Sequence, residues 1–201
     1  MNDNNQTHRE KMKQVKADHL ARVKQNKKSD RGLLMIHTGD GKGKSTAAFG
    51  TALRAIGWGH DVAIVQYVKG TWKTGEKEFF KLIPDLLRLE VMGQGFTWET
   101  QDRQRDIAAA TKAWEVSCDI MNSGDYDLLV LDELNIVLRD GYLDVDMVRQ
   151  GLLARHPRTT VIVTGRNAPN SLIKVADLVT SMEKVKHPFD AGIKAARGID
   201  F

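Results

Sequence analysis

A run of glycine, lysine and hydroxyl side chains near residue 40 has the composition of a phosphate-binding loop. It reads Thr38, Gly39, Asp40, Gly41, Lys42, Gly43, Lys44, Ser45 and Thr46. Glycines let successive backbone N–H groups turn toward phosphate oxygens, while Lys44 adds a positive charge and the Ser45 hydroxyl is a ligand for Mg²⁺. The usual pattern, G-x-x-x-x-G-K-[S/T], begins with glycine, and here that position is Thr38. An apolar strand before the run and a helix after it complete the context, so we predict a nucleotide-phosphate site.

A pair of carboxylates, Asp132 and Glu133, follows the apolar run 128–131. The carboxyl ends of parallel strands share one crevice, so we expect this pair to face Ser45 across a metal ion. The alternative, a helix-capping Asp beside a surface Glu, explains either residue alone but not their place after a buried strand. With the loop, the pair predicts a bound magnesium nucleotide with Ser45, Asp132 and Glu133 as metal ligands.

Short apolar runs and helical stretches alternate around these motifs and must position them. Strands are predicted at 33–37, 62–67, 89–92, 128–131 and 160–163, with a weaker sixth at 178–181. Helices are predicted at 44–56, 76–81, 103–121, 144–154 and 171–175. The strand runs are almost continuously apolar, as in buried parallel sheets. We therefore predict an α/β protein with a RecA-like phosphate-loop fold, in which a mostly parallel, doubly wound sheet of about six strands has helices on both faces.

The basic charge of the chain is concentrated in its first residues. Residues 1–31 hold nine of the 30 Lys and Arg but only four of the 26 acidic residues, which leaves 32–201 with a net charge of −1. We therefore predict a basic tail over 1–31 and one nucleotide-binding domain over 32–201. Apolar side chains recur at helical spacing in the tail (Met12, Val15, His19, Leu20 and Val23). Two interpretations stay open: a solvated charged helix, or a segment that closes over an active site or partner subunit.

Composition excludes several protein classes. The chain is 41% hydrophobic and 28% charged, which is typical of a globular domain and not of a disordered or fibrous one. We find no apolar run long enough to span a membrane and no secretory signal in the polar N-terminus. The single cysteine, Cys118, fits a reducing compartment, so we expect a cytoplasmic protein with no membrane contact.

Six collinear segments resemble the phosphate-loop type of ATP:corrinoid adenosyltransferase from the cobalamin pathway. They are T-G-D-G-K-G-K-S-T-A-A-F-G (38–50), V-Q-Y-V-K-G-T-W (65–72), G-F-T-W-E-T-Q (95–101), V-L-D-E-L (130–134), V-T-G-R (163–166) and K-H-P-F-D-A-G-I-K-A-A-R-G-I-D (186–200). The resemblance covers residues 33–201. It implies that a cobalt(I) corrinoid, cob(I)alamin or a precursor, attacks the 5′ carbon of ATP and displaces inorganic triphosphate.

The resemblance also implies roles for particular residues. Lys42, Lys44, the loop amides and Mg²⁺ (or Mn²⁺) would neutralise the leaving triphosphate, with ATP lying in the reverse sense along the loop. Cobalt(I) is itself a strong nucleophile, so Glu133 is expected to be a metal or ribose ligand and not a water activator. Phe96 and Trp98 match a pair that crowds the lower face of the corrin and displaces its axial base; without the resemblance, core packing explains them.

Further positions and partners follow from the same resemblance. Arg54 matches a position near the nucleotide, against the alternative of a solvated helix arginine, and Arg166 with Thr164 and Gly165 ends the fifth strand at the same crevice. A homodimer and an electron-donating reductase or flavoprotein are expected partners. Two alternatives remain: a phosphate-loop ATPase or kinase with Glu133 as base, and a RecA-like nucleic-acid-binding module with a basic arm. The net charge of −1 on the body argues against nucleic-acid binding.

Overall fold

The computed structural model describes residues 3–25, 29–68, 73–92 and 102–200. It divides the chain into two units, Met1–Asp30 and Arg31–Phe201. The first unit is the helix α1 (Asp3–Gln25), whose described side chains are all exposed. The apolar stripe predicted for this segment is about half exposed at each of its hydrophobic positions: Met12, Val15, Leu20 and Val23.

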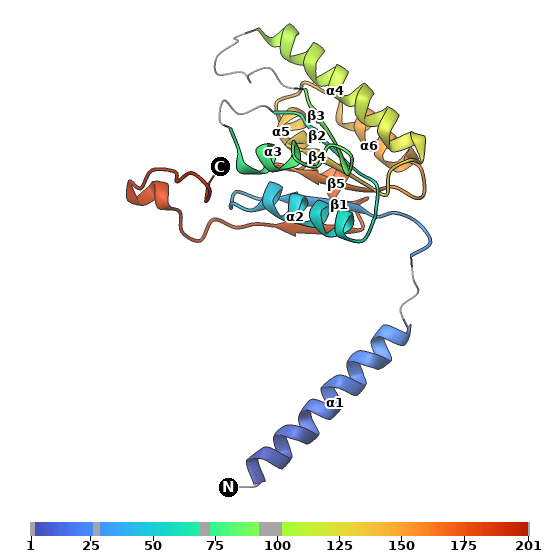
Figure 1. The fold of residues 1–201 in the computed structure, drawn as a ribbon, viewed down its shortest axis with the longest axis vertical. Helices are drawn as coiled ribbons and strands as arrows, with labels where there is room; N and C mark the ends of the chain where they lie inside the picture. The colour runs from blue at the N-terminus through green and yellow to red at the C-terminus, as the bar shows by residue number, and fades with distance from the viewer. Residues whose placement is uncertain (1–2, 26–28, 69–72, 93–101, 201) are drawn as a thin grey trace. The chain divides into compact units, whose positions relative to one another are not determined.

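The second unit is built on a six-stranded sheet with the strand order β3-β2-β4-β5-β1-β6 (Figure 1). Its strands are β1 (Leu34–Thr38), β2 (Val62–Gln66), β3 (Leu87–Val91), β4 (Leu128–Asp132), β5 (Thr160–Thr164) and β6 (Leu178–Ser181). Its helices are α2 (Lys44–Gly57), α3 (Gly75–Phe80), α4 (Arg103–Ser123), α5 (Leu134–Arg139), α6 (Val145–Ala154), α7 (Asn170–Ile173) and the 3₁₀ turn η1 (Pro188–Ala191). All strand pairs are parallel, so the six carboxyl ends lie at one edge of the sheet.

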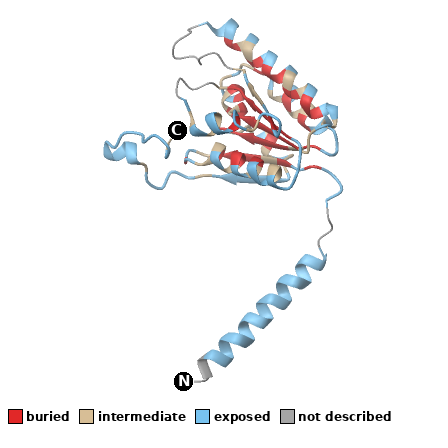
Figure 2. Cartoon of the chain, viewed as in Figure 1, coloured by how far each residue is buried: buried red, intermediate tan, exposed pale blue. Residues whose placement is uncertain are grey.

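Two apolar layers cover the sheet, one on each face. Successive residues of a strand point to opposite faces, so Ile64 belongs to the layer under α2 and α3, whereas Val65 belongs to the layer under α4 to α7. Phe49 and Phe80 meet edge to face in the first layer, and Trp114 of α4 packs in the second. Figure 2 shows the buried residues gathered in the strands and on the inward sides of the helices. This double cover explains why the central strands β2, β4 and β5 are apolar on both faces, whereas the edge strand β6 is exposed.

The predicted fold class is confirmed, and so are the six strands. β3 begins at Leu87, two residues before the prediction, because Leu87 pairs with Val62 at the start of β2. The helix α5, which follows β4 after a single residue, was not predicted. No described helix is both long and apolar enough to cross a membrane.

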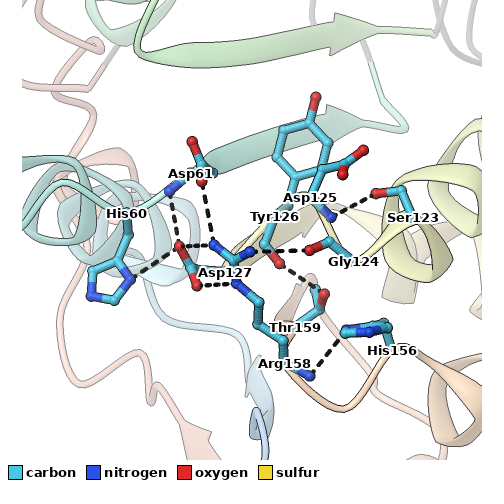
Figure 3. Close-up of polar contacts among 10 residues, drawn as sticks. All are labelled: His60, Asp61, Ser123, Gly124, Asp125, Tyr126, Asp127, His156, Arg158 and Thr159. Carbon is cyan, nitrogen blue, oxygen red and sulfur yellow. Dashed lines mark hydrogen bonds and ion pairs between the residues drawn. The ribbon is translucent and has the colours of Figure 1, made fainter.

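Charged side chains connect the strands at the amino edge of the sheet (Figure 3). Arg158, just before β5, binds both carboxylate oxygens of Asp127, just before β4, at 2.7 and 3.0 Å. It also reaches Asp61, just before β2, at 3.3 Å and the carbonyl of Gly124 at 3.2 Å. His60 Nδ1 lies 3.2 Å from Asp127. The Arg158 hydrogen bonds lower the pKa of Asp127 to about 2, so this carboxylate stays charged in the folded protein over nearly the whole acid range.

We expect Asp127→Asn to destabilise the protein in a pH-dependent way. The folded-state pKa lies below the ordinary value of 3.8, so the carboxylate stabilises the fold above that value and loses its effect as pH falls toward 2. The loss should be about 1 kcal/mol at pH 5 and 7, because the pair is partly exposed, and should shrink at pH 3. Urea unfolding at the three pH values measures it. Glu115→Gln, an exposed acid on α4, is the control, and a difference that grows on acidification would contradict this prediction.

Candidate active site

The predicted phosphate loop joins the end of β1 to the start of α2 and closes on its own lysine. Gly39 and Gly43 adopt positive φ angles of 91° and 105°, which side chains disfavour. The chain therefore curls so that Lys44 Nζ donates to the carbonyls of Gly39 at 2.8 Å and Gly41 at 2.6 Å. Lys44 is buried, and burial lowers the pKa of its ammonium, while the negative charge of Glu133 opposes that shift. The site therefore places a buried positive charge where phosphate would bind.

The edge strand β6 holds the loop in place. The N–H of Gly41 donates to the carbonyl of Met182 at 2.7 Å, and the N–H of Met182 donates to the carbonyl of Thr38 at 2.8 Å. A Cβ at Gly39 would lie 2.4 Å from the Met182 oxygen, so glycine is required there. Thr38 replaces the usual first glycine without conflict, because it is the last residue of β1 and its hydroxyl accepts the N–H of Ala168. Neither Met182 nor Ala168 was predicted, since backbone contacts leave no mark in residue type.

Four residues form a hydrogen-bonded group across the ends of β2, β4 and β5, which we call the carboxyl-edge network: Gln66, Asp132, Glu133 and Thr164. Gln66 Nε2 donates to Asp132 Oδ2 at 2.9 Å, and the Thr164 hydroxyl donates to Asp132 Oδ1 at 2.8 Å. The N–H of Glu133 donates to the same Thr164 oxygen at 2.9 Å. Each oxygen of Asp132 therefore accepts one hydrogen bond and keeps a further lone pair, so Asp132 is positioned by its neighbours and its metal ligation stays a prediction.

Glu133 is the group that this network presents to the site. Its backbone is left-handed, with φ 63°, which turns the chain from β4 into α5. Glu133 Oε2 is buried and has no hydrogen-bond partner within the described part of the chain. Burial, followed by the charge of Asp132, raises the pKa of Glu133 to about 7, although Lys44 and Arg166 oppose the shift. A cation or a hydroxyl bound here would supply the partner that Oε2 lacks.

Gly165 leaves the space in which Glu133 lies. It has a φ of 124°, and an added Cβ would stand 2.9 Å from Asn135 Cβ and 3.1 Å from Glu133 Oε2. The carbonyl of Gly165 accepts a hydrogen bond from Asn135 Nδ2 at 3.0 Å. Asn135 was not predicted, because it lies in the short helix α5 that the sequence did not reveal. The V-T-G-R segment therefore contributes two features to the site: the Thr164 hydroxyl, and the space that Gly165 leaves because it has no side chain.

Two of the other predicted residues, Arg166 and Lys42, lie near the loop. Arg166 lies close enough to Lys44 and Glu133 that its charge lowers the pKa of both. Lys42 forms an ion pair with Asp200 beside a pocket of about 490 Å³. The lining of this pocket comprises Lys42, Gly43, Thr46, Gly75, Glu76, Gly198, Ile199 and Asp200.

Three predicted residues, Arg54, Phe96 and Trp98, are not among the contacts described above. Arg54 is exposed in the last turn of α2, about 15 Å along the helix from Lys44. Phe96 and Trp98 lie outside the described residues, so their role stays a prediction. In the described ranges, no three His, Cys, Asp or Glu side chains cluster as a metal site of their own.

We expect Gly165→Ala to impair the site through Glu133 and Asn135. The new Cβ overlaps both, and alanine is strained at φ 124°, so the free energy of unfolding should fall by about 1–3 kcal/mol. Adenosyl transfer, the activity expected from the sequence, should fall further than the loss of folded protein explains. The matched control is Gly50→Ala on α2, where a Cβ meets nothing within 4 Å. Thermal unfolding and single-turnover rates measure both variants, and native-like rates for Gly165→Ala would contradict the prediction.

One solved structure with a similar chain path is the flagellar accessory protein FlaH from Methanocaldococcus jannaschii. The two superpose with a TM-score of 0.50 over 75% of this chain and 71% of that chain, at 13% sequence identity. At that identity the likeness concerns the fold alone.

Sequence comparisons give a much closer match. The family model described as ATP:corrinoid adenosyltransferase BtuR/CobO/CobP matches residues 30–201. A corrinoid adenosyltransferase of Pseudomonas aeruginosa is 49% identical over 99% of this chain and 98% of its own length. Those of Sinorhizobium sp. and Escherichia coli K12 are 47% and 41% identical, over 90% and 96% of this chain and 85% and 97% of their own lengths. The chain therefore belongs to the ATP:corrinoid adenosyltransferase family.

Proposed function

We propose that the loop between β1 and α2 binds the triphosphate of ATP as the leaving group of an alkyl transfer. The protein is a corrinoid adenosyltransferase, which transfers the 5′-deoxyadenosyl group of ATP to the cobalt(I) of a corrinoid in adenosylcobalamin formation. The observation that carries the proposal is the buried Lys44 ammonium at the centre of a glycine-rich loop. Phosphate oxygens would replace the loop carbonyls as its partners.

Bond changes in this reaction define what the protein must stabilise. Cobalt(I) donates an electron pair to the 5′ carbon of ATP and becomes cobalt(III) in the alkyl product. The bond between that carbon and the α-phosphate oxygen breaks, and its electron pair leaves with inorganic triphosphate. No proton is transferred, so no general base is needed. Catalysis therefore depends on placing positive charge around the oxygen that becomes negative.

The described residues supply that charge from two sides. Lys44 and the loop N–H groups approach from the end of β1, and Arg166 approaches from the end of β5. Lys42 also lies on the loop, and triphosphate would compete with Asp200 for it. ATP lying in the reverse sense along the loop, with its 5′ carbon exposed to the corrinoid, is consistent with Thr38 at the first glycine position.

The donor set fits Mg²⁺ or Mn²⁺ held jointly with the nucleotide. Glu133 offers a buried oxygen that has no partner among the described residues, and Ser45, the second residue of α2, offers its hydroxyl. Mg²⁺ commonly binds one or two protein oxygens and fills its remaining positions with phosphate oxygens and water. When bound, the ion would neutralise charge on the leaving triphosphate. Asp132, the third predicted metal ligand, would also orient Glu133 through Thr164.

Three more assignments rest on the family resemblance. Phe96 and Trp98 would crowd the lower face of the corrin and displace its axial base, which eases reduction of cobalt(II) to cobalt(I). Arg54 would contact the nucleotide. The protein would act as a homodimer in the cytoplasm and receive its electron from a reductase or flavoprotein.

An anaerobic assay with ATP, Mg²⁺ and chemically reduced cob(I)alamin tests the proposal. We expect adenosylcobalamin and triphosphate in equal amounts. Lys44→Met should lower kcat by about 10²–10³-fold, because it removes a preorganised positive charge from the leaving group. Lys112→Met, at an exposed lysine on α4, should leave kcat unchanged. ADP and phosphate formed regardless of corrinoid would refute the proposal.

We further propose that residues 1–31 act as a lid over the corrinoid, contributed to the same or a partner subunit. The support is the set of apolar side chains at helical spacing in α1, Met12, Val15, Leu20 and Val23, each of which is about half exposed. Deleting residues 1–28 should then raise the KM for cob(I)alamin far more than the Kd for ATP. Steady-state kinetics and equilibrium nucleotide binding measure the two, and an equal loss of both would contradict the lid.

A further inference from the structure

The two ends of the Gln66 side-chain amide differ in their contacts. It is the last residue of β2 and is 6% exposed. Its Nε2 donates to Asp132 Oδ2 at 2.9 Å. A carboxylate only accepts hydrogen bonds, so the amide nitrogen must face Asp132 and the amide oxygen must face away from it. The orientation of this amide is therefore set by charge.

Gln66 Oε1 is buried and has no hydrogen-bond partner among the described residues. The main chain around it is fully engaged, because the N–H of Met92 donates to the Gln66 carbonyl at 3.1 Å and the N–H of Tyr67 donates to the Asp132 carbonyl at 3.0 Å. A buried acceptor without a partner is costly, and in native proteins such groups commonly have a functional role. The negative Asp132 on the other side of the amide polarises it and makes Oε1 a stronger acceptor.

The strand order places this oxygen beyond the triphosphate. Gln66 is linked through Asp132 and Thr164 to Glu133, so it belongs to the active-site edge. However, β2 is separated from β1 by β4 and β5, which puts the end of β2 about 14 Å from the end of β1. An acceptor at that distance from the phosphate loop serves the parts of the two substrates other than phosphate.

We propose that Gln66 is a substrate-binding residue whose Oε1 accepts a hydrogen bond from an uncharged donor of the reacting pair. Two groups have this chemistry: a ribose hydroxyl of ATP and a carboxamide N–H at the corrinoid periphery. The inference rests on the proposed placement of ATP and corrinoid along this edge. Asp132 then acts as a positioning residue, because it selects the acceptor face of the amide.

Gln66→Met tests the proposal, since methionine has a similar size and no amide. The variant should weaken binding of one substrate by about 2- to 13-fold, the range for loss of one neutral hydrogen bond. If the donor is a ribose hydroxyl, 2′-deoxy-ATP or 3′-deoxy-ATP should bind the wild type as weakly as ATP binds Gln66→Met. The same deoxy nucleotide should bind Gln66→Met no more weakly than ATP does. For the corrinoid source, only the KM for cob(I)alamin should rise, and cobyrinic acid a,c-diamide should show a smaller effect.

Two further variants serve as controls for Gln66→Met. Gln150→Met, at an exposed glutamine on α6, is the matched control and should leave both substrates unaffected. Gln66→Glu keeps an acceptor in place and can share a proton with Asp132, so it should retain more substrate affinity than Gln66→Met. Unchanged constants for a folded Gln66→Met, or equal losses in the Glu and Met variants, would overturn the proposal. Wild-type formation of adenosylcobalamin and triphosphate is scored separately, so failure here is distinct from failure of the proposed function.

Discussion

Burial of the Lys44 ammonium at the start of α2 is the constraint on which the rest of the site depends. An ammonium out of water needs several oxygen partners, and the positive φ angles of Gly39 and Gly43 turn two loop carbonyls toward it. Glu133 supplies the opposing charge from the next part of the edge, which favours the charged lysine. The opposite charges of Lys44 and Glu133 lower the free-energy cost of burying each other. Triphosphate would therefore bind where positive charge is already in position.

The structure around Glu133 accepts local strain to keep that carboxylate in place. The left-handed backbone at Glu133 is unfavourable for a residue with a side chain, and the Thr164 hydroxyl holds it by accepting the Glu133 N–H. Gly165 has no side chain, and the Cβ of any other residue at this position would press against Asn135 and Glu133. Asp132, the last residue of β4, supports this arrangement because its two carboxylate oxygens accept hydrogen bonds from Gln66 and Thr164.

The two edges of the sheet differ in how completely their polar groups are paired. At the amino edge, Arg158 and Asp127 satisfy each other and join the starts of three strands. At the carboxyl edge, Gln66, Glu133 and Asn135 each retain a buried oxygen without a partner in the described residues. The first arrangement stabilises the fold, whereas the second leaves acceptors for ligands to satisfy. Stability and function are thus separated along the strand direction, as is common when a binding site needs groups that the fold does not use.

Sequence alone determined the strand–loop–helix, the parallel α/β class, and Lys44, Ser45, Asp132 and Glu133 as residues of one edge, because apolar runs and glycine spacing are local signals. The six collinear segments determined the family for the same reason. Tertiary structure decided what those residues do to one another. It engaged Asp132 with Gln66 and Thr164 and held the loop on Met182, far along the chain. It also left Glu133 with a buried oxygen that has no hydrogen-bond partner among the described residues. These contacts join strands that are neighbours only in the folded sheet, so no local pattern of residue types specifies them.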